Sequence, residues 1–235
     1  MSGRNEPPRF EVLAYEDTAL GPLCLRRREL LVEPGTVVTE VTLDHEFLMG
    51  SYNTASERAL ASVALALRPG RDLDVLVGGL GLGYTAREAL ASDRVGRVEV
   101  VELLPQVIGW VERGLVPLAG ELKADPRLAI VEGDVYRRLA APPRRAHDLI
   151  LIDVDHSPSE RLDEASGSFY AREGLESAKR HLRPGGVLAV WSCAESSPFS
   201  EALRRAFREV RVEPVAFMNK LVGSAQTDWL FFARG

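Results

Sequence analysis

Cysteines are few and long apolar runs are missing, and both absences narrow the class of protein. Only Cys24 and Cys193 occur among 235 residues. Two cysteines cannot build a disulfide framework, and such a low count is typical of proteins kept in a reducing compartment. No apolar stretch approaches the length that a membrane-spanning helix needs, and residues 1–8 contain no apolar signal segment. We therefore expect a soluble, cytoplasmic protein that does not associate with membranes.

An excess of positive charge is also missing. The chain has 29 Lys and Arg against 34 Asp and Glu, which gives a formal net charge of −5. This balance gives no non-specific attraction to nucleic acid, so no nucleic-acid partner is expected. The hydrophobic share of 46% and the charged share of 27% are ordinary for a globular protein. The length suits one substantial domain with a small addition.

Residues 10–49 differ from the rest of the chain in their pattern of turn residues and β-branched residues. Gly-Pro and Pro-Gly pairs separate short segments, and the segment 36–43 is rich in β-branched residues. This pattern predicts a small antiparallel β segment. We divide the chain into an N-terminal β segment, 1–52, and a second domain, 53–235.

Two local patterns in this first part lead to structural expectations. Thr54, with Glu57 three residues later, predicts a capping box at the start of a helix over 55–67. The charge run Arg26-Arg27-Arg28 is typical of a solvated sheet edge.

Beyond residue 70, apolar strands alternate with amphipathic helices. Strands are expected at 73–77, 97–101, 128–131, 148–152, 187–191, 211–217 and 228–233, and helices near 84–92, 105–113, 172–181 and 199–207. Nearly all-apolar strands that alternate with helices indicate a parallel sheet covered on both faces. The expected fold class is therefore α/β, a Rossmann-like, doubly wound, mainly parallel sheet with a small N-terminal β segment.

A glycine-rich loop, Gly78-Gly-Leu-Gly-Leu-Gly83, follows the first of these strands. Glycines let the backbone approach a ligand with no Cβ in the way, and the next helix offers free N–H groups. Such loops also occur for packing reasons, so the loop alone is a weak signal. Glu102 strengthens it, because a carboxylate at the end of the next strand can accept hydrogen bonds from ribose hydroxyls. The residues expected to bind a nucleoside are Gly78, Gly79, Gly81, Gly83 and Glu102.

Further carboxylates follow two later strands. Asp134 can meet an adenine amino group or can cap the next helix, and both interpretations stay open. The strand at 148–152 leads into Asp153-Val-Asp155-His156, at the edge where open α/β sheets form their ligand crevices. Asp153 and Asp155 could hold an ammonium group or deprotonate an amine, and His156 could act as a base or cap a loop. These three residues are the catalytic candidates.

Residues 73–191 resemble a class I S-adenosylmethionine-dependent methyltransferase, and within that superfamily they most resemble the spermidine synthases. The similar stretches are Gly78–Gly83, Arg87-Glu88, Val98–Leu103, Val131–Asp134, Asp148–Asp153 and Leu182–Val187. The segment before residue 50 is similar to the small N-terminal domain of that family. The resemblance implies transfer of an aminopropyl group from decarboxylated S-adenosylmethionine to an amine such as a polyamine. It also implies that Asp153 is the base and that the N-terminal strands form a homodimer.

The chain departs from the family pattern around the expected acceptor site. The family's Asp-Ser-Ser/Thr-Asp-Pro is Asp153-Val-Asp-His-Ser-Pro158 here, and Gly81 and Leu82 stand where the glycine loop normally carries an aspartate. A small-molecule methyltransferase that uses S-adenosylmethionine, or a non-catalytic nucleoside-binding homologue, are therefore alternatives. No metal is expected, because Trp191-Ser-Cys193 replaces the Asp-Asn pair that a metal-dependent methyltransferase would need.

Overall fold

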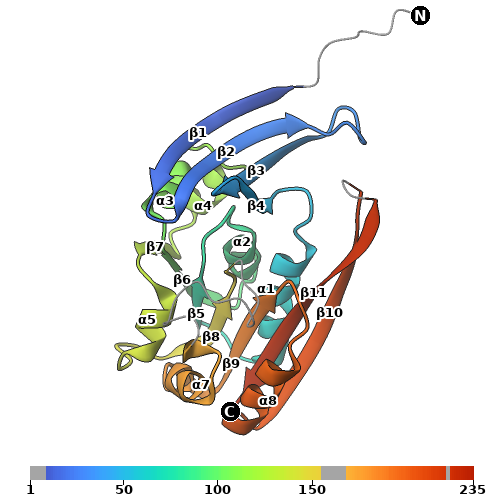
Figure 1. Ribbon diagram of the computed structural model, residues 1–235. Coiled ribbons are helices and arrows are strands. Elements are labelled where there is room, and N and C mark those ends of the chain that lie inside the picture. Colours follow the sequence, from blue (N-terminus) through green and yellow to red (C-terminus); the bar gives the residue numbers. More distant parts are fainter. Residues whose placement is uncertain (1–8, 155–167, 221–222) are drawn as a thin grey trace, which may run out of the picture.

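The computed structural model describes residues 9–154, 168–220 and 223–235, which contain two β-sheets and their flanking helices (Figure 1). The first sheet is antiparallel and has the strand order β1-β2-β3-β4. Its strands are β1 (Phe10–Thr18), β2 (Gly21–Glu29), β3 (Val37–Leu43) and β4 (Glu46–Gly50). The N-terminal antiparallel β segment expected from the sequence is therefore present.

The second sheet has seven strands in the order β10-β11-β9-β8-β5-β6-β7. Five of them run parallel: β5 (Leu73–Gly78), β6 (Val95–Glu102), β7 (Leu128–Glu132), β8 (His147–Ile152) and β9 (Leu182–Ser192). The antiparallel hairpin of β10 (Glu209–Asn219) and β11 (Ser224–Arg234) extends the sheet next to β9. The expected α/β fold with a mainly parallel sheet is confirmed.

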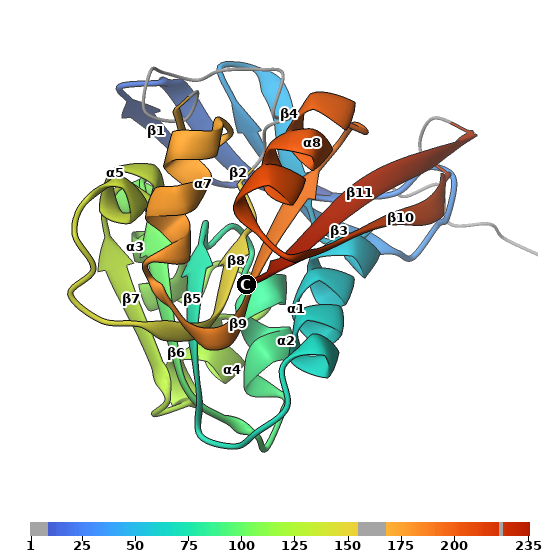
Figure 2. The ribbon, with the colours of Figure 1, turned by 90° about the horizontal axis from the view of Figure 1, so that it is seen from below.

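Helices cover both faces of this sheet (Figure 2). One face carries α1 (Ala55–Leu67), α2 (Tyr84–Leu90), α3 (Pro105–Glu112) and α4 (Ala119–Ala124). The other face carries α5 (Val135–Ala140), α7 (Arg172–Lys179) and α8 (Ser197–Ala206). The sequence analysis did not predict α4, which is a short helix of six residues.

Strand β8 shows why the central strands are apolar throughout. Leu149 and Leu151 pack into the core under α1–α4, whereas Ile150 and Ile152 pack into the core under α5, α7 and α8. All four side chains are fully buried. Successive side chains of a strand point to opposite faces, so a strand covered on both sides needs an apolar residue at every position. Each such side chain contributes about 2 kcal/mol to folding.

The four-stranded sheet lies over the carboxyl ends of the parallel strands (Figure 1). Leu23 and Leu25 of β2 belong to the same core as α1–α4. The Arg27 guanidinium donates a hydrogen bond to the Leu115 carbonyl at 3.2 Å. On β4, the Met49 sulfur would lie 3.1 Å from a Cβ placed on Gly81. The N-terminal sheet therefore forms one wall above the glycine loop.

Two expectations about this part of the chain are wrong. Strand β2 is an inner strand, and Arg26 and Arg28 both bind the buried Glu40 carboxylate, so the arginine run is not a solvated edge. Thr54 does precede α1, but its side chain caps no helix N–H and instead accepts a hydrogen bond from Arg58. The expected capping box between Thr54 and Glu57 is therefore absent. The Glu57 carboxylate instead lies near the acidic groups Asp153 and Asp228, which are described below.

Ion pairs close the opposite end of the parallel sheet. The Asp148 carboxylate binds the guanidinium groups of Arg68 and Arg183 and accepts a hydrogen bond from the Asp74 N–H at 2.9 Å. Burial alone would raise the pKa of Asp148, but these donors and positive charges hold that pKa below its usual value. Asp148 thus connects β8 with α1, β5 and β9. Across the described ranges, no helix has both the length and the apolar character needed to cross a membrane.

Candidate active site

The glycine loop connects β5 to α2 at the carboxyl edge of the sheet. Gly78 ends β5, Gly79 and Gly81 lie in the loop, and Gly83 is the N-cap residue of α2. Gly79 has φ +92°, and a Cβ there would lie only 2.1 Å from the Asp153 carbonyl oxygen. Both the backbone angle and the lack of space exclude a side chain at this position. The loop is thereby packed directly against the residue that follows β8.

Glu102, the last residue of β6, points its carboxylate at this loop. One oxygen accepts a hydrogen bond from the Leu80 N–H and the other accepts one from the Leu104 N–H, each at 2.8 Å. The side chain is 7% exposed, and burial raises its pKa against the opposing effect of these donors. The N–H groups of Gly81 and Leu103 also act on this carboxylate, so four main-chain donors surround it. Binding of the two ribose hydroxyls by Glu102 stays a prediction.

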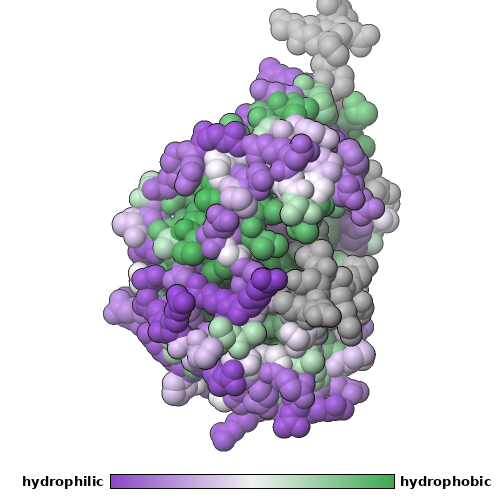
Figure 3. Space-filling view, turned by 60° about the vertical axis from the view of Figure 1, so that its left-hand side comes forward, coloured by the Kyte–Doolittle hydropathy of each residue, from purple (hydrophilic) through white to green (hydrophobic). Residues whose placement is uncertain are grey.

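Apolar surface lies next to this carboxylate. Leu103, directly after Glu102, is 49% exposed, and Val131 near the end of β7 is 42% exposed. Figure 3 shows a hollowed patch of apolar surface with hydrophilic surface next to it. A flat aromatic base would cover such a surface, since burying apolar area is the main favourable term in ligand binding.

Asp134 is the N-cap residue of α5. Its Oδ1 accepts hydrogen bonds from the N–H groups of Tyr136 at 2.8 Å and Arg137 at 3.1 Å. The helix-capping interpretation therefore describes its present contacts, and a contact with an adenine amino group stays a prediction.

Asp153 follows β8 immediately and meets α2. Its main-chain N–H donates to the Gly78 carbonyl at 2.8 Å, and its carboxylate accepts a hydrogen bond from the Thr85 hydroxyl. The side chain is partly buried. Desolvation raises the pKa of Asp153 to about 6, and the charge of Asp228 adds to this effect. The other two catalytic candidates, Asp155 and His156, lie outside the described residues.

Two more carboxylates approach Asp153, and the sequence analysis did not select either. Glu57 lies in the first turn of α1, and burial together with the charge of Asp153 raises its pKa to about 7. Asp228 lies on β11, where burial raises its pKa. The Ser56 hydroxyl lies 2.6 Å from an Asp228 oxygen and 3.1 Å from a Glu57 oxygen. A signal was present at Asp228, which is an acidic residue at the start of the apolar run 229–233.

In the part of the chain that the structure describes, no group of three or more His, Cys, Asp or Glu side chains is arranged to hold a metal ion. Glu57 and Asp228 place two further acidic groups near Asp153.

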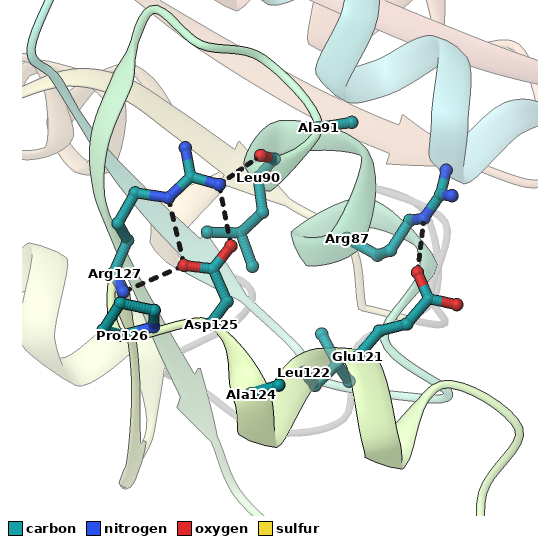
Figure 4. A pocket seen from close by; sticks show the side chains of 9 residues that line it. All are labelled: Arg87, Leu90, Ala91, Glu121, Leu122, Ala124, Asp125, Pro126 and Arg127. Carbon is teal, nitrogen blue, oxygen red and sulfur yellow. Dashed lines mark hydrogen bonds and ion pairs between the residues drawn. The ribbon is translucent and has the colours of Figure 1, made fainter.

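A second hollow lies on the other side of α2, between α2 and α4 (Figure 4). Its volume is about 500 Å³. Two arginines line it, but Arg87 is paired with Glu121 and Arg127 is paired with Asp125. Both positive charges in this hollow are therefore already paired with carboxylates.

The fold and the glycine loop define a protein with the class I methyltransferase-like fold. Residues 53–226 match the family model described as the spermine/spermidine synthase domain. The chain belongs to the spermine/spermidine synthase family, which confirms the resemblance seen in the sequence.

Individual relatives agree with this assignment. A polyamine aminopropyltransferase of Prochlorococcus marinus (strain MIT 9313) is 33% identical over 151 residues, which cover 64% of this chain and 48% of that protein. Polyamine aminopropyltransferase 2 of Streptomyces coelicolor is 32% identical over 143 residues, covering 60% of this chain and 24% of that protein. The chain thus spans half or less of the length of these relatives.

Solved structures show the same fold. A spermidine synthase in complex with the transition state analogue AdoDATO has a TM-score of 0.75 at 21% identity, covering 95% of this chain and 73% of that one. The spermidine synthase from Thermotoga maritima has a TM-score of 0.73 at 20% identity, covering 95% and 72%.

Proposed function

We propose that this chain is a spermidine synthase-like transferase, which moves an aminopropyl group from decarboxylated S-adenosylmethionine to an amine activated near Asp153. The observation that carries the proposal is the position of Asp153, a partly buried carboxylate with a pKa of about 6 that is packed against the nucleoside loop. The relatives described as polyamine aminopropyltransferases support it.

The crevice fits the nucleoside half of this substrate. The Glu102 carboxylate at the end of β6 would accept hydrogen bonds from the two ribose hydroxyls in place of some of its main-chain donors, and the exposed apolar surface of Leu103 and Val131 suits the adenine ring. When bound, the substrate supplies a positively charged sulfur that makes its neighbouring carbon electrophilic.

Asp153 would complete the reaction by taking a proton. The neutral nitrogen of the acceptor bonds to the carbon next to the sulfonium, and the carbon–sulfur bond breaks with its electron pair remaining on sulfur. The nitrogen then loses one proton to the Asp153 carboxylate. A base with a pKa near 6 is ionised at neutral pH and is within the range useful for general base catalysis.

The acceptor is proposed to be a polyamine or a related small amine. Glu57 and Asp228 place additional acidic groups beside Asp153, and negative charge in a partly buried site attracts ammonium groups. A homodimer formed through the N-terminal strands, a cytoplasmic location and a domain boundary at residue 52 also stay predictions.

The direct test is an assay with decarboxylated S-adenosylmethionine and a panel of amines that includes putrescine and spermidine. We expect methylthioadenosine and an aminopropylated amine as products. Asp153→Asn should lower kcat about 100-fold or more, which is the usual contribution of a general base, while methylthioadenosine binding stays intact. Glu132→Gln, an exposed carboxylate on β7, is the matched control and should keep full activity.

Two outcomes would contradict the proposal. One is the absence of turnover over the whole panel, or equal kcat values for Asp153→Asn and the wild type. The other is formation of a methylated product from S-adenosylmethionine, which would favour the methyltransferase alternative.

A further inference from the structure

The Thr85 hydroxyl is buried between two acceptors at the start of α2. Thr85 is 3% exposed. Its Oγ1 is hydrogen-bonded to Oδ2 of Asp153 and lies 3.2 Å from the main-chain carbonyl oxygen of Glu57. These two contacts connect α2 both to the end of β8 and to the first turn of α1.

A hydroxyl group has one hydrogen to donate and two lone pairs to accept with. The Glu57 carbonyl can only accept. If Asp153 is ionised, it also can only accept, and the single Thr85 hydrogen serves one of the two partners. If Asp153 is protonated, it donates to Thr85 Oγ1, the Thr85 hydrogen is free for the Glu57 carbonyl, and all three groups are satisfied.

We propose that Thr85 is a positioning residue for Asp153, whose hydroxyl hydrogen donates to the ionised carboxylate and turns to the Glu57 carbonyl once Asp153 has taken the proton from the acceptor amine. The movement is a rotation about one C–O bond, and the heavy atoms stay in place. This role rests on the proposed function, in which Asp153 is the base.

The other groups around Asp153 act in the opposite direction. Glu57 reaches it from α1 and Asp228 from β11, and both are acidic. Negative neighbours and burial favour the protonated carboxyl, whereas the Thr85 hydroxyl favours the ionised one. Removing this hydroxyl should therefore make Asp153 retain its proton to a higher pH.

The experiment measures the titration of Asp153 itself. Protein labelled with ¹³C at the aspartate carboxyl groups is titrated by NMR, and the Asp153 signal is assigned by its loss in Asp153→Asn. Thr85→Val, which keeps the shape and removes the hydroxyl, should raise the titration midpoint of Asp153 by roughly one pH unit. Thr85→Ser, which keeps the hydroxyl, should titrate like the wild type. The same upward shift should appear in the pH dependence of aminopropyl transfer.

An unchanged Asp153 midpoint in folded Thr85→Val would overturn the inference. If Thr85→Val does not fold, Thr85→Ala is compared with Thr85→Ser instead, with the same expected difference and the same contrary result. The NMR measurement needs no turnover. A shifted midpoint in a protein without aminopropyltransferase activity would therefore contradict the proposed function and leave the coupling between Thr85 and Asp153 established.

Discussion

Glu102 is the side chain on which nucleoside binding depends most. Its two carboxylate oxygens accept hydrogen bonds from the Leu80 and Leu104 N–H groups, and these contacts fix the carboxylate beside the loop. Glu102→Gln replaces one of these oxygens by an NH₂ group, which cannot accept. We expect methylthioadenosine affinity to fall about 10- to 100-fold by calorimetry, as for the loss of hydrogen bonds to a charged group. Glu132→Gln, its cross-strand neighbour, should bind like the wild type. Equal affinities for both variants would place the ribose elsewhere.

The pKa values near the base predict how activity depends on pH. Asp153 must be ionised to accept a proton, and its pKa is raised to about 6, so kcat/KM should rise as the pH increases through about 6. Asp228→Asn removes a negative charge that raises this pKa. The rise should therefore move to lower pH, opposite to the shift expected for Thr85→Val. A profile that stays in place in Asp228→Asn would show that Asp228 does not act on the base.

Acceptor binding should be coupled to proton release. Burial and the charge of Asp153 raise the pKa of Glu57 to about 7. Near pH 6.5 the Glu57 carboxyl group is therefore still protonated in a large share of the molecules. An ammonium group placed beside it favours the ionised form and expels protons. Calorimetry of putrescine binding near pH 6.5, in buffers of different ionisation enthalpy, should show this release. Glu57→Gln should release fewer protons, and equal release by both proteins would exclude Glu57 from the acceptor site.

The turn between β5 and α2 depends on glycine for two separate reasons, which substitution can distinguish. Gly79 and Gly114 both have positive φ, +92° and +76°, but only Gly79 is enclosed, whereas nothing lies within 4 Å of a Cβ at Gly114. Gly114→Ala should cost about 1 kcal/mol of unfolding free energy from the backbone angle alone. Gly79→Ala must also displace the Asp153 carbonyl, so we expect a larger loss in urea unfolding and a loss of methylthioadenosine binding. Equal effects at the two positions would contradict the close approach of β8 to the loop.

The ion pairs around Asp148 hold α1, β5 and β9 to β8. Asp148→Asn leaves Arg68 and Arg183 without their partner and should cost about 3 kcal/mol, the low end for a broken buried pair because both arginines are partly exposed. Asp93→Asn breaks an exposed pair with Arg71 and should cost less than about 1 kcal/mol.

Acid sensitivity gives a second measurement of the same pairs. The pKa of Asp148 is lowered in the fold, so its stabilising effect is present above the unfolded pKa and is lost as the pH falls below about 4. In urea unfolding, Asp148→Asn should therefore lose less stability between pH 6 and pH 3 than the wild type does. Parallel losses in both proteins would show that Asp148 contributes little to the pH dependence.

Over the full chain, the sequence predicted those features well that depend on residues close together in the sequence. The apolar strands, the glycine loop and Glu102 at the next strand end follow from local spacing, and they place the nucleoside crevice. Glu57 and Asp228 do not follow in this way. Ser56 and Asp228 are hydrogen-bonded although they are 172 residues apart, and only the packing of α1 against β11 brings them together. The local pattern at Thr54 and Glu57 predicted a helix cap, but the buried acidic neighbourhood of Glu57 decided its orientation.

A structure of the chain bound to methylthioadenosine would test most directly whether the crevice joins a nucleoside to the base. We expect both ribose hydroxyls within hydrogen-bonding distance of the Glu102 carboxylate, the adenine against Leu103 and Val131, and the sulfur on the side of the loop where Asp153 lies. Density for the nucleoside away from the glycine loop, or a Glu102 carboxylate that makes no contact with the ribose, would contradict the proposed function.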